Sequence, residues 1–144
     1  MNILECSLKT EQAARLAGVR MGTVQYWVST GLITPHKPPQ GSGTSTGWAF
    51  LDIIRLRIIS RLRNGGISLQ KIRIALKRLG EWGEADPLGS GRLLAINGEL
   101  FWIGSEEHLV NILQGQRALS KVLLIDLQEV AEDTRTKIRA MCAA

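Results

Sequence analysis

The chain has 144 residues, 44% of them hydrophobic, and a formal net charge of +5. This length and apolar content allow the packed core of one domain or of two small ones, and they exclude wholesale disorder. No apolar run reaches about 18 residues, the length that a membrane-spanning helix needs, and the first residues lack the apolar core of a secretion signal. We therefore expect a cytoplasmic protein that does not enter the membrane.

The two cysteines, Cys6 and Cys142, stand near opposite ends of the chain. Neither has another Cys or a His at the spacing of a metal site, and two distant cysteines are not a disulfide framework. We expect both to be incidental thiols, and we expect no metal and no cofactor.

The charge is divided unevenly along the chain. Residues 1–80 hold 12 Lys and Arg against 3 Asp and Glu, whereas residues 81–144 hold 6 against 10. A basic half beside an acidic half is expected if only the first half meets phosphate. Basic helices that are merely solvated would give the same count, so the charge alone leaves both interpretations open.

The first predicted elements are two short helices, over residues 10–17 and 21–29, joined by a tight turn. Thr10 is a suitable N-cap, and Gly18 permits the positive φ that a sharp turn between helices requires. Val24 begins the apolar stripe of the second helix. This pattern is typical of a DNA-binding helix-turn-helix, and the alternative is an ordinary helical hairpin.

Residues 34–47 are rich in Pro, Gly, Ser and Thr and stand between an apolar and an aromatic segment, which predicts a β-hairpin wing. Two further helices follow at 51–64 and 68–79. Each combines an apolar stripe with several Lys and Arg on its remaining surface. The Gly-rich, acidic segment 81–91 predicts a linker between domains.

The remainder of the chain predicts a β-β-α-β-α unit. Asn97-Gly98 between two apolar strands is a strong signal for a two-residue hairpin turn. A helix at 106–113, a strand at 121–127 and a helix at 127–140 complete the order.

The fold class expected for the whole chain is α+β. It consists of an N-terminal winged helix-turn-helix domain (1–80), the linker (81–91) and a small α+β domain (92–144). A domain of about 50 residues has a small core, and pairing with a second copy or another protein would bury more apolar surface. We expect Trp102 and Leu124 to make that dimer or partner contact.

Residues 7–79 as a whole resemble the MerR-type winged helix-turn-helix. The resemblance rests on Gly31-Leu32 followed by Pro35, a Gly-rich wing, Trp48, Asp52, and the segments DIIRLRIISRLRNGG and ISLQKIRIAL. Residues 8–32 also resemble the excisionase-like variant of this fold. Effector-sensing MerR regulators continue their fourth helix into a coiled coil, whereas this chain breaks at Gly80, so no metal or drug ligand is carried over.

From Phe50 to about Arg135 the chain is similar to the front part of a group of prokaryotic antitoxins. The similar segments are FLDIIRLRIISRLRNGGISLQKIRIALKRL, DPLGS at 86–90, RLLAINGELFW and HLVNILQGQRAL. Such antitoxins are thought to pair with PIN-type ribonuclease toxins. The resemblance implies a toxin protein as a partner of the acidic half.

Two functions follow from these observations. The first is a dimeric, sequence-specific DNA-binding transcription regulator, which could control its own gene, with the helix at 21–29 in the major groove and basic residues on phosphate. The alternative is the antitoxin of a toxin–antitoxin pair. The expected DNA-binding residues are Lys9, Arg20, Thr23, Gln25, Tyr26, Ser29, Lys37, Arg55 and Arg57.

We expect no enzymatic activity and name no catalytic residue. The two histidines, His36 and His108, lie in unrelated segments. Asp126 follows a predicted strand, where catalytic carboxylates do occur, but no partner is spaced to work with it.

Overall fold

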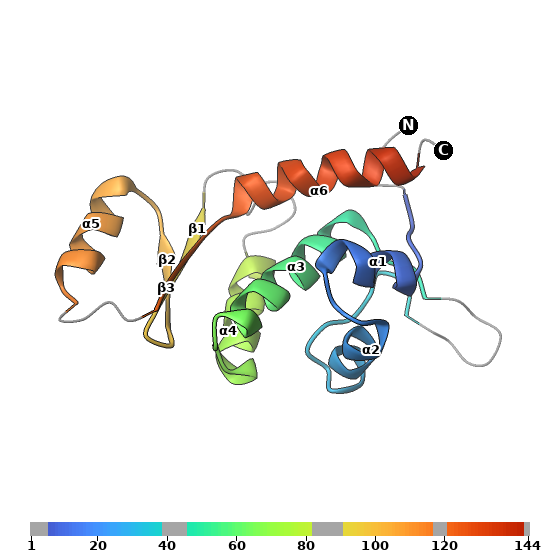
Figure 1. Ribbon diagram of the computed structural model, residues 1–144, viewed down its shortest axis with the longest axis horizontal. Coiled ribbons are helices and arrows are strands. Elements are labelled where there is room, and N and C mark those ends of the chain that lie inside the picture. The colour runs from blue at the N-terminus through green and yellow to red at the C-terminus, as the bar shows by residue number, and fades with distance from the viewer. Residues whose placement is uncertain (1–5, 39–45, 82–90, 117–120, 143–144) are drawn as a thin grey trace. The chain divides into compact units, whose positions relative to one another are not determined.

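The computed structural model describes residues 6–38, 46–81, 91–116 and 121–142 (Figure 1). The elements, in chain order, are α1 (Thr10–Ala17), α2 (Met21–Ser29), α3 (Phe50–Asn64), α4 (Leu69–Glu81), β1 (Arg92–Ile96), β2 (Glu99–Ile103), α5 (Glu106–Gln114), β3 (Val122–Asp126) and α6 (Leu127–Cys142). The α+β fold class is confirmed, and the helices and strands predicted within the described residues are present. In the described part of the chain, no helix is long and apolar enough to cross a membrane.

The chain forms two compact units. The first unit comprises Met1–Ser60 together with Ala131–Ala144, and the second comprises Arg61–Val130. The chain therefore leaves the first unit within α3 and returns to it within α6. These units differ from the predicted domains 1–80 and 92–144, because the C-terminal half of α6 contacts α3 and belongs to the first unit. Most of the predicted linker lies outside the described residues.

In the first unit, α1 and α2 form the predicted helix-turn-helix. Gly18 closes α1 in the left-handed region, with φ of 71°, and the next N–H, of Val19, donates to the carbonyl of Ala14 at 3.1 Å. The predicted N-cap was wrong by one residue. Lys9 is the N-cap, and Thr10 instead accepts a hydrogen bond at 2.9 Å from the indole N–H of the buried Trp48.

The stem of the predicted wing is also present. Lys37 and Gly47 exchange two backbone hydrogen bonds of 2.9 and 2.8 Å, and Leu8 and Trp48 exchange two of 2.8 Å. The hairpin between these arms, residues 39–45, lies outside the described residues. The second arm of the stem is thus tied both to the first arm and to the segment that leads into α1.

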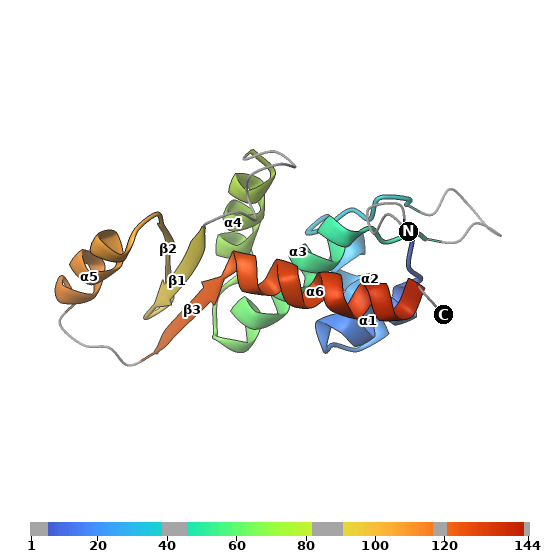
Figure 2. The ribbon, with the colours of Figure 1, turned by 90° about the horizontal axis from the view of Figure 1, so that it is seen from above.

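The C-terminal half of α6 completes the core of the first unit beside α3 (Figure 2). Thr134 and Ile138 on its inner face are buried, and the Arg135 guanidinium lies 5.3 Å from the centroid of the Phe50 ring. The expectation of two incidental thiols was wrong, because α6 returns to the segment before α1. Cys6 and Cys142 form a disulfide, with their Cα atoms 6.6 Å apart.

The second unit contains a three-stranded antiparallel sheet of order β2-β1-β3. Asn97 and Gly98 have φ of 51° and 85°, so both central residues of the hairpin turn are left-handed, as a type I′ turn requires. Helix α5 covers one face of the sheet over a small cluster of Leu94, Ile96 and Ile103. Ser105 caps α5, accepting a 3.1 Å hydrogen bond from the backbone of its third following residue.

Candidate nucleic-acid interface

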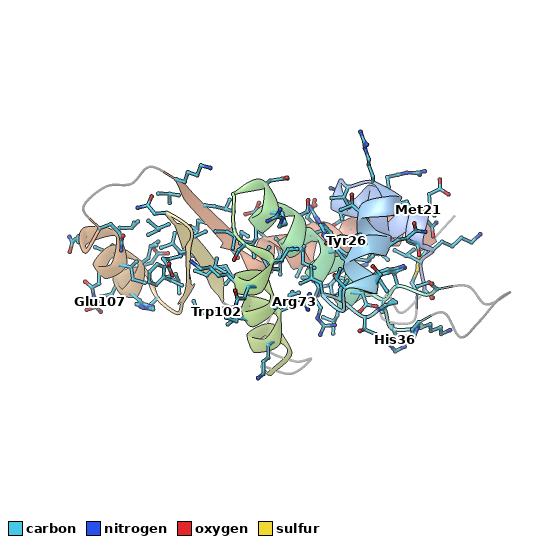
Figure 3. The ribbon with its side chains drawn as sticks, turned by 90° about the horizontal axis from the view of Figure 1, so that it is seen from below. Met21, Tyr26, His36, Arg73, Trp102 and Glu107 are labelled. Carbon is cyan, nitrogen blue, oxygen red and sulfur yellow. A yellow bond between two sulfur atoms is a disulfide. The ribbon has the colours of Figure 1, made fainter. Side chains whose placement is uncertain are left out.

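The outer face of α2 is exposed, whereas its inner face is buried. Val24 and Trp27 are 0% and 5% exposed and hold the helix against the core of the first unit. On the opposite side Met21, Gln25 and Tyr26 are exposed, Met21 to 45% and Tyr26 to 57% (Figure 3). Because successive residues of a helix are about 100° apart, this is one continuous face of the kind that enters the major groove.

The beginning of α2 is cationic. Arg20 is the N-cap and is exposed, and the first turn holds no acidic residue. The first N–H groups of a helix have no partner within it, and they carry partial positive charge. Arg20 adds a full charge at the same end, so this helix start favours an anion such as a backbone phosphate.

Asp52 fixes the stem of the wing. Its carboxylate accepts hydrogen bonds from the backbone N–H of His36 at 2.8 Å and of Ala49 at 2.9 Å, and it lies 3.5 Å from the guanidinium of Arg55. One side chain therefore joins the two arms of the wing, next to the exposed Lys37. Sequence reasoning noted Asp52 but missed this role, although an acid three residues into a helix is the second half of a capping box.

Gly47 allows the two arms to approach each other. A Cβ at this position would lie 2.5 Å from the Ser7 hydroxyl oxygen and 3.0 Å from the Cβ of Lys37. A side chain here would displace the Ser7 hydroxyl and crowd the side chain of Lys37 on the facing arm.

The structure brings most of the predicted DNA-binding residues to the surface of the first unit. Those that are exposed are Lys9, Arg20, Gln25, Tyr26, Ser29 and Lys37, whereas Thr23 and Arg55 are half-buried. The Ser29 hydroxyl donates to the carbonyl of Tyr26 at 2.8 Å and keeps its acceptor capacity. Met21, which forms no hydrogen bond to a base and is not among the predicted residues, shares the outer face of α2.

Arg57 does not present its head group as predicted. Its side chain is 12% exposed, lies 2.8 Å from the carboxylate of Asp133, and donates to the hydroxyl of Thr134 at 2.7 Å. The guanidinium is thus occupied by α6, and we remove Arg57 from the set of phosphate contacts. Hydrogen bonds from Lys137 and then from Arg57 hold the pKa of the Asp133 carboxyl below its ordinary value of 3.8.

The two residues predicted to contact a partner lie on opposite faces of the sheet in the second unit. Leu124 pairs with Leu94 and is 43% exposed. Trp102 pairs with Leu93, whose side chain points to the other face, and is half-buried (Figure 3). The structure therefore does not bring the two together.

The groups considered for catalysis have other surroundings. Asp126 accepts hydrogen bonds of 3.0 and 3.3 Å from the backbone N–H groups of Gln128 and Glu129, which makes it the cap of α6. Among the described residues, no three His, Cys, Asp or Glu side chains are grouped so that they could hold a metal ion.

These features define the class of the first unit as a winged helix-turn-helix, a class that binds double-stranded DNA. The family profile described as MerR HTH family regulatory protein matches residues 8–79. The chain belongs to this MerR family, which confirms the resemblance drawn from the sequence.

Curated relatives extend the match beyond the helix-turn-helix. Proteins of Mycobacterium bovis and Mycobacterium tuberculosis, each named an uncharacterized HTH-type transcriptional regulator, are 35% identical over 104 residues, which cover 72% of this chain and 46% of the relative. The chain thus spans about half the length of the curated relatives that it matches.

Proposed function

We propose that this protein is a sequence-specific transcription regulator that places α2 in the major groove of double-stranded DNA. The observation that carries the proposal is the exposed outer face of α2, which begins at the cationic Arg20 and lies in a winged helix-turn-helix of the MerR family. We assign no enzymatic role to it and propose that it acts in the cytoplasm.

The side chains of α2 suit distinct parts of a DNA site. Gln25 carries both a donor and an acceptor and suits an adenine edge, and Thr23 and Tyr26 supply hydroxyl groups. Met21 offers an apolar contact of the kind that a thymine methyl group makes. Ser29 lies on the same exposed side.

Backbone phosphates would be bound by the basic side chains around this face. They are Lys9, Arg20, Lys37 and Arg55. Such contacts set the register of the protein on the duplex without reading its sequence.

We propose further that the regulator is a homodimer formed through β3. The carbonyl of Lys121 accepts from the N–H of Asn97 at 3.1 Å, so the alternate residues Val122 and Leu124 turn their backbone groups away from β1. No strand of the described chain pairs with that outer edge, and Val122 and Leu124 are 48% and 43% exposed. An antiparallel β3 of a second copy would satisfy this edge. Trp102 remains the second proposed partner contact.

A dimer would present two copies of α2 to two half-sites, so the operator is expected to be palindromic. Control of its own gene is the simplest arrangement, and it predicts such a site upstream of the gene.

The antitoxin alternative is favoured by the surface of α5. Its exposed residues include Glu106, Glu107 and Val110, and acidic and apolar side chains side by side suit a basic toxin surface. A PIN-type ribonuclease gene next to this gene, and co-purification of its product with this chain, would support the alternative.

Selection of bound sequences from random duplex DNA with the purified full chain, followed by gel-shift titration, tests the proposal. A palindromic consensus is expected, and Gln25→Ala should relax the preference at one base pair of each half-site. Equal affinity for the consensus and for random duplex would overturn sequence-specific recognition by α2.

A further inference from the structure

Cys6 and Cys142 are the two cysteines of the chain, and the structure joins them. Their Cα atoms are 6.6 Å apart, a separation that a disulfide spans without movement of the backbone. Both side chains are half-buried rather than buried, so a small oxidant or reductant reaches them. All thiol chemistry of this chain is therefore located at one place.

The bond connects two segments of the first unit that are 136 positions apart in sequence. Cys6 lies two residues before Leu8, whose backbone pairs with Trp48 at the stem of the wing, and it leads directly into α1. Cys142 is the last residue of α6. The disulfide therefore fastens the end of α6 to the entrance of the helix-turn-helix.

The docking of α6 also has contacts that need no disulfide. Thr134 and Ile138 are 0% and 1% exposed, and Arg57 is bound to Asp133 and Thr134. With the bond broken, these contacts still hold the middle of α6 in place, and the two thiols stay close together. We therefore expect the reduced first unit to stay folded, as a reversible site requires.

We propose that Cys6 and Cys142 form a reversible oxidation site, which takes a peroxide as oxidant and locks the last turns of α6 onto the DNA-binding unit. That this lock serves regulation rests on the proposed function in DNA binding. The lock itself is a property of the first unit alone.

Oxidation of the two thiols by one peroxide molecule proceeds in two steps. One thiolate attacks a peroxide oxygen and becomes a sulfenic acid, while the other oxygen leaves as hydroxide and takes a proton to form water. The second thiolate then attacks the sulfenic sulfur, the S–S bond forms, and the sulfenic oxygen leaves as a second water after protonation. A dithiol reductant reverses the bond by thiol–disulfide exchange and is itself oxidised to a disulfide.

Thiol trapping tests the proposal on the full chain without DNA. The reduced protein is treated with hydrogen peroxide or with buffer, and N-ethylmaleimide and mass spectrometry then count the remaining thiols. We expect the mass of a single, uncross-linked chain, with two modified cysteines after buffer and none after peroxide, and dithiothreitol should restore both. Both thiols remaining after peroxide, or a disulfide between two chains, would overturn the site.

Hydrogen exchange measures the lock. Amides of residues 138–142 and 8–12 should exchange more slowly, by about tenfold, in the oxidised protein, because local opening of the end of α6 is then prevented. Cys6→Ser and Cys142→Ser are matched controls that keep the shape of the side chain, and peroxide should leave their exchange unchanged. Equal exchange of oxidised and reduced wild-type protein would show that the bond locks nothing. Because no DNA is present, a failure here is distinct from a failure of the proposed function.

Discussion

The guanidinium of Arg57 in α3 lies 2.8 Å from the carboxylate of Asp133 in α6, and the two side chains are 12% and 45% exposed. Arg57 also donates to Thr134, so its head group is directed toward α6 rather than toward solvent. This pair joins α3 to a part of α6 that the chain reaches only after passing through the second unit.

The pair predicts the effect of Asp133→Asn. The substitution keeps the size of the side chain but leaves the mostly buried Arg57 without its counter-ion. Because Asp133 itself is half in water, we expect the free energy of unfolding to fall by only about 1 kcal/mol. Urea unfolding at neutral pH measures this loss. Glu129→Gln, an exposed change on the same helix, should leave the free energy of unfolding within about 0.5 kcal/mol of the wild-type value.

The same pair predicts a pH dependence. The pKa of Asp133 is lowered in the folded protein by Lys137 and Arg57, so the folded state binds this proton less readily than the unfolded state. The stability that the carboxylate contributes is therefore complete above the ordinary pKa of 3.8 and is lost as the pH falls through the lower folded value. Unfolding curves of wild type and Asp133→Asn should converge below that window. A constant difference at every pH would contradict this account.

Asp52 predicts a coupled loss of stability and of DNA binding. In Asp52→Ala two backbone N–H groups, of His36 and Ala49, lose their acceptor, and we expect a loss of about 2 kcal/mol in the free energy of unfolding. DNA affinity should fall alike for every sequence, because the wing stem that carries Lys37 loosens. Asp52→Asn retains one acceptor oxygen. Its unfolding temperature and its DNA affinity should lie between those of wild type and Asp52→Ala, as thermal unfolding and gel-shift assays can measure.

Replacement by alanine is expected to change the free energy of unfolding in opposite directions at Gly47 and Gly22. Gly47→Ala would place a Cβ 2.5 Å from the Ser7 hydroxyl oxygen and 3.0 Å from the Cβ of Lys37, and it should cost about 1–3 kcal/mol. Gly22→Ala meets no atom within 4 Å and lies inside α2, where alanine is better than glycine by about 1 kcal/mol. Thermal unfolding of the two variants should therefore shift in opposite directions. Equal shifts would contradict the steric argument at the wing stem.

The salt dependence of DNA binding should differ between variants of Arg20, a proposed phosphate contact, and of Arg57, which is bound to α6. Each lost phosphate contact lowers the slope of log affinity against log salt by about 1. Arg20→Ala should show this decrease, whereas Arg57→Met should leave the slope unchanged because α6 already occupies its guanidinium. Gel-shift titrations at several salt concentrations give both slopes. A reduced slope for Arg57→Met would show that Arg57 does contact a DNA phosphate.

The sequence predicted those features that depend on neighbours along the chain. The two helices around Gly18, the turn at Asn97-Gly98 and the stem of the wing are each determined by residues within one motif, so periodicity and turn chemistry identified them. The family resemblance supplied the function of the first unit, because composition alone could not separate DNA binding from solvated basic helices.

Two of the missed features, the ion pair of Arg57 and the pairing of the two cysteines, depend on α6 returning to the first unit. Arg57 was assigned to phosphate because it stands among other arginines, and its partner Asp133 is not a neighbour in sequence. Cys6 and Cys142, 136 positions apart, were interpreted as isolated thiols for the same reason. Such pairings depend on topology, which no local pattern in a single sequence records.

The return of α6 also has a consequence for synthesis of the chain on the ribosome. Residues of the first unit up to Ser60 emerge early, but their last helix follows only after Arg61–Val130 has been made. Synthesis proceeds at about 5–20 residues per second. For several seconds, therefore, Arg57 and the apolar residues around it are exposed because α6 has not yet been made. The second unit, although later in sequence, can thus be the first to finish folding.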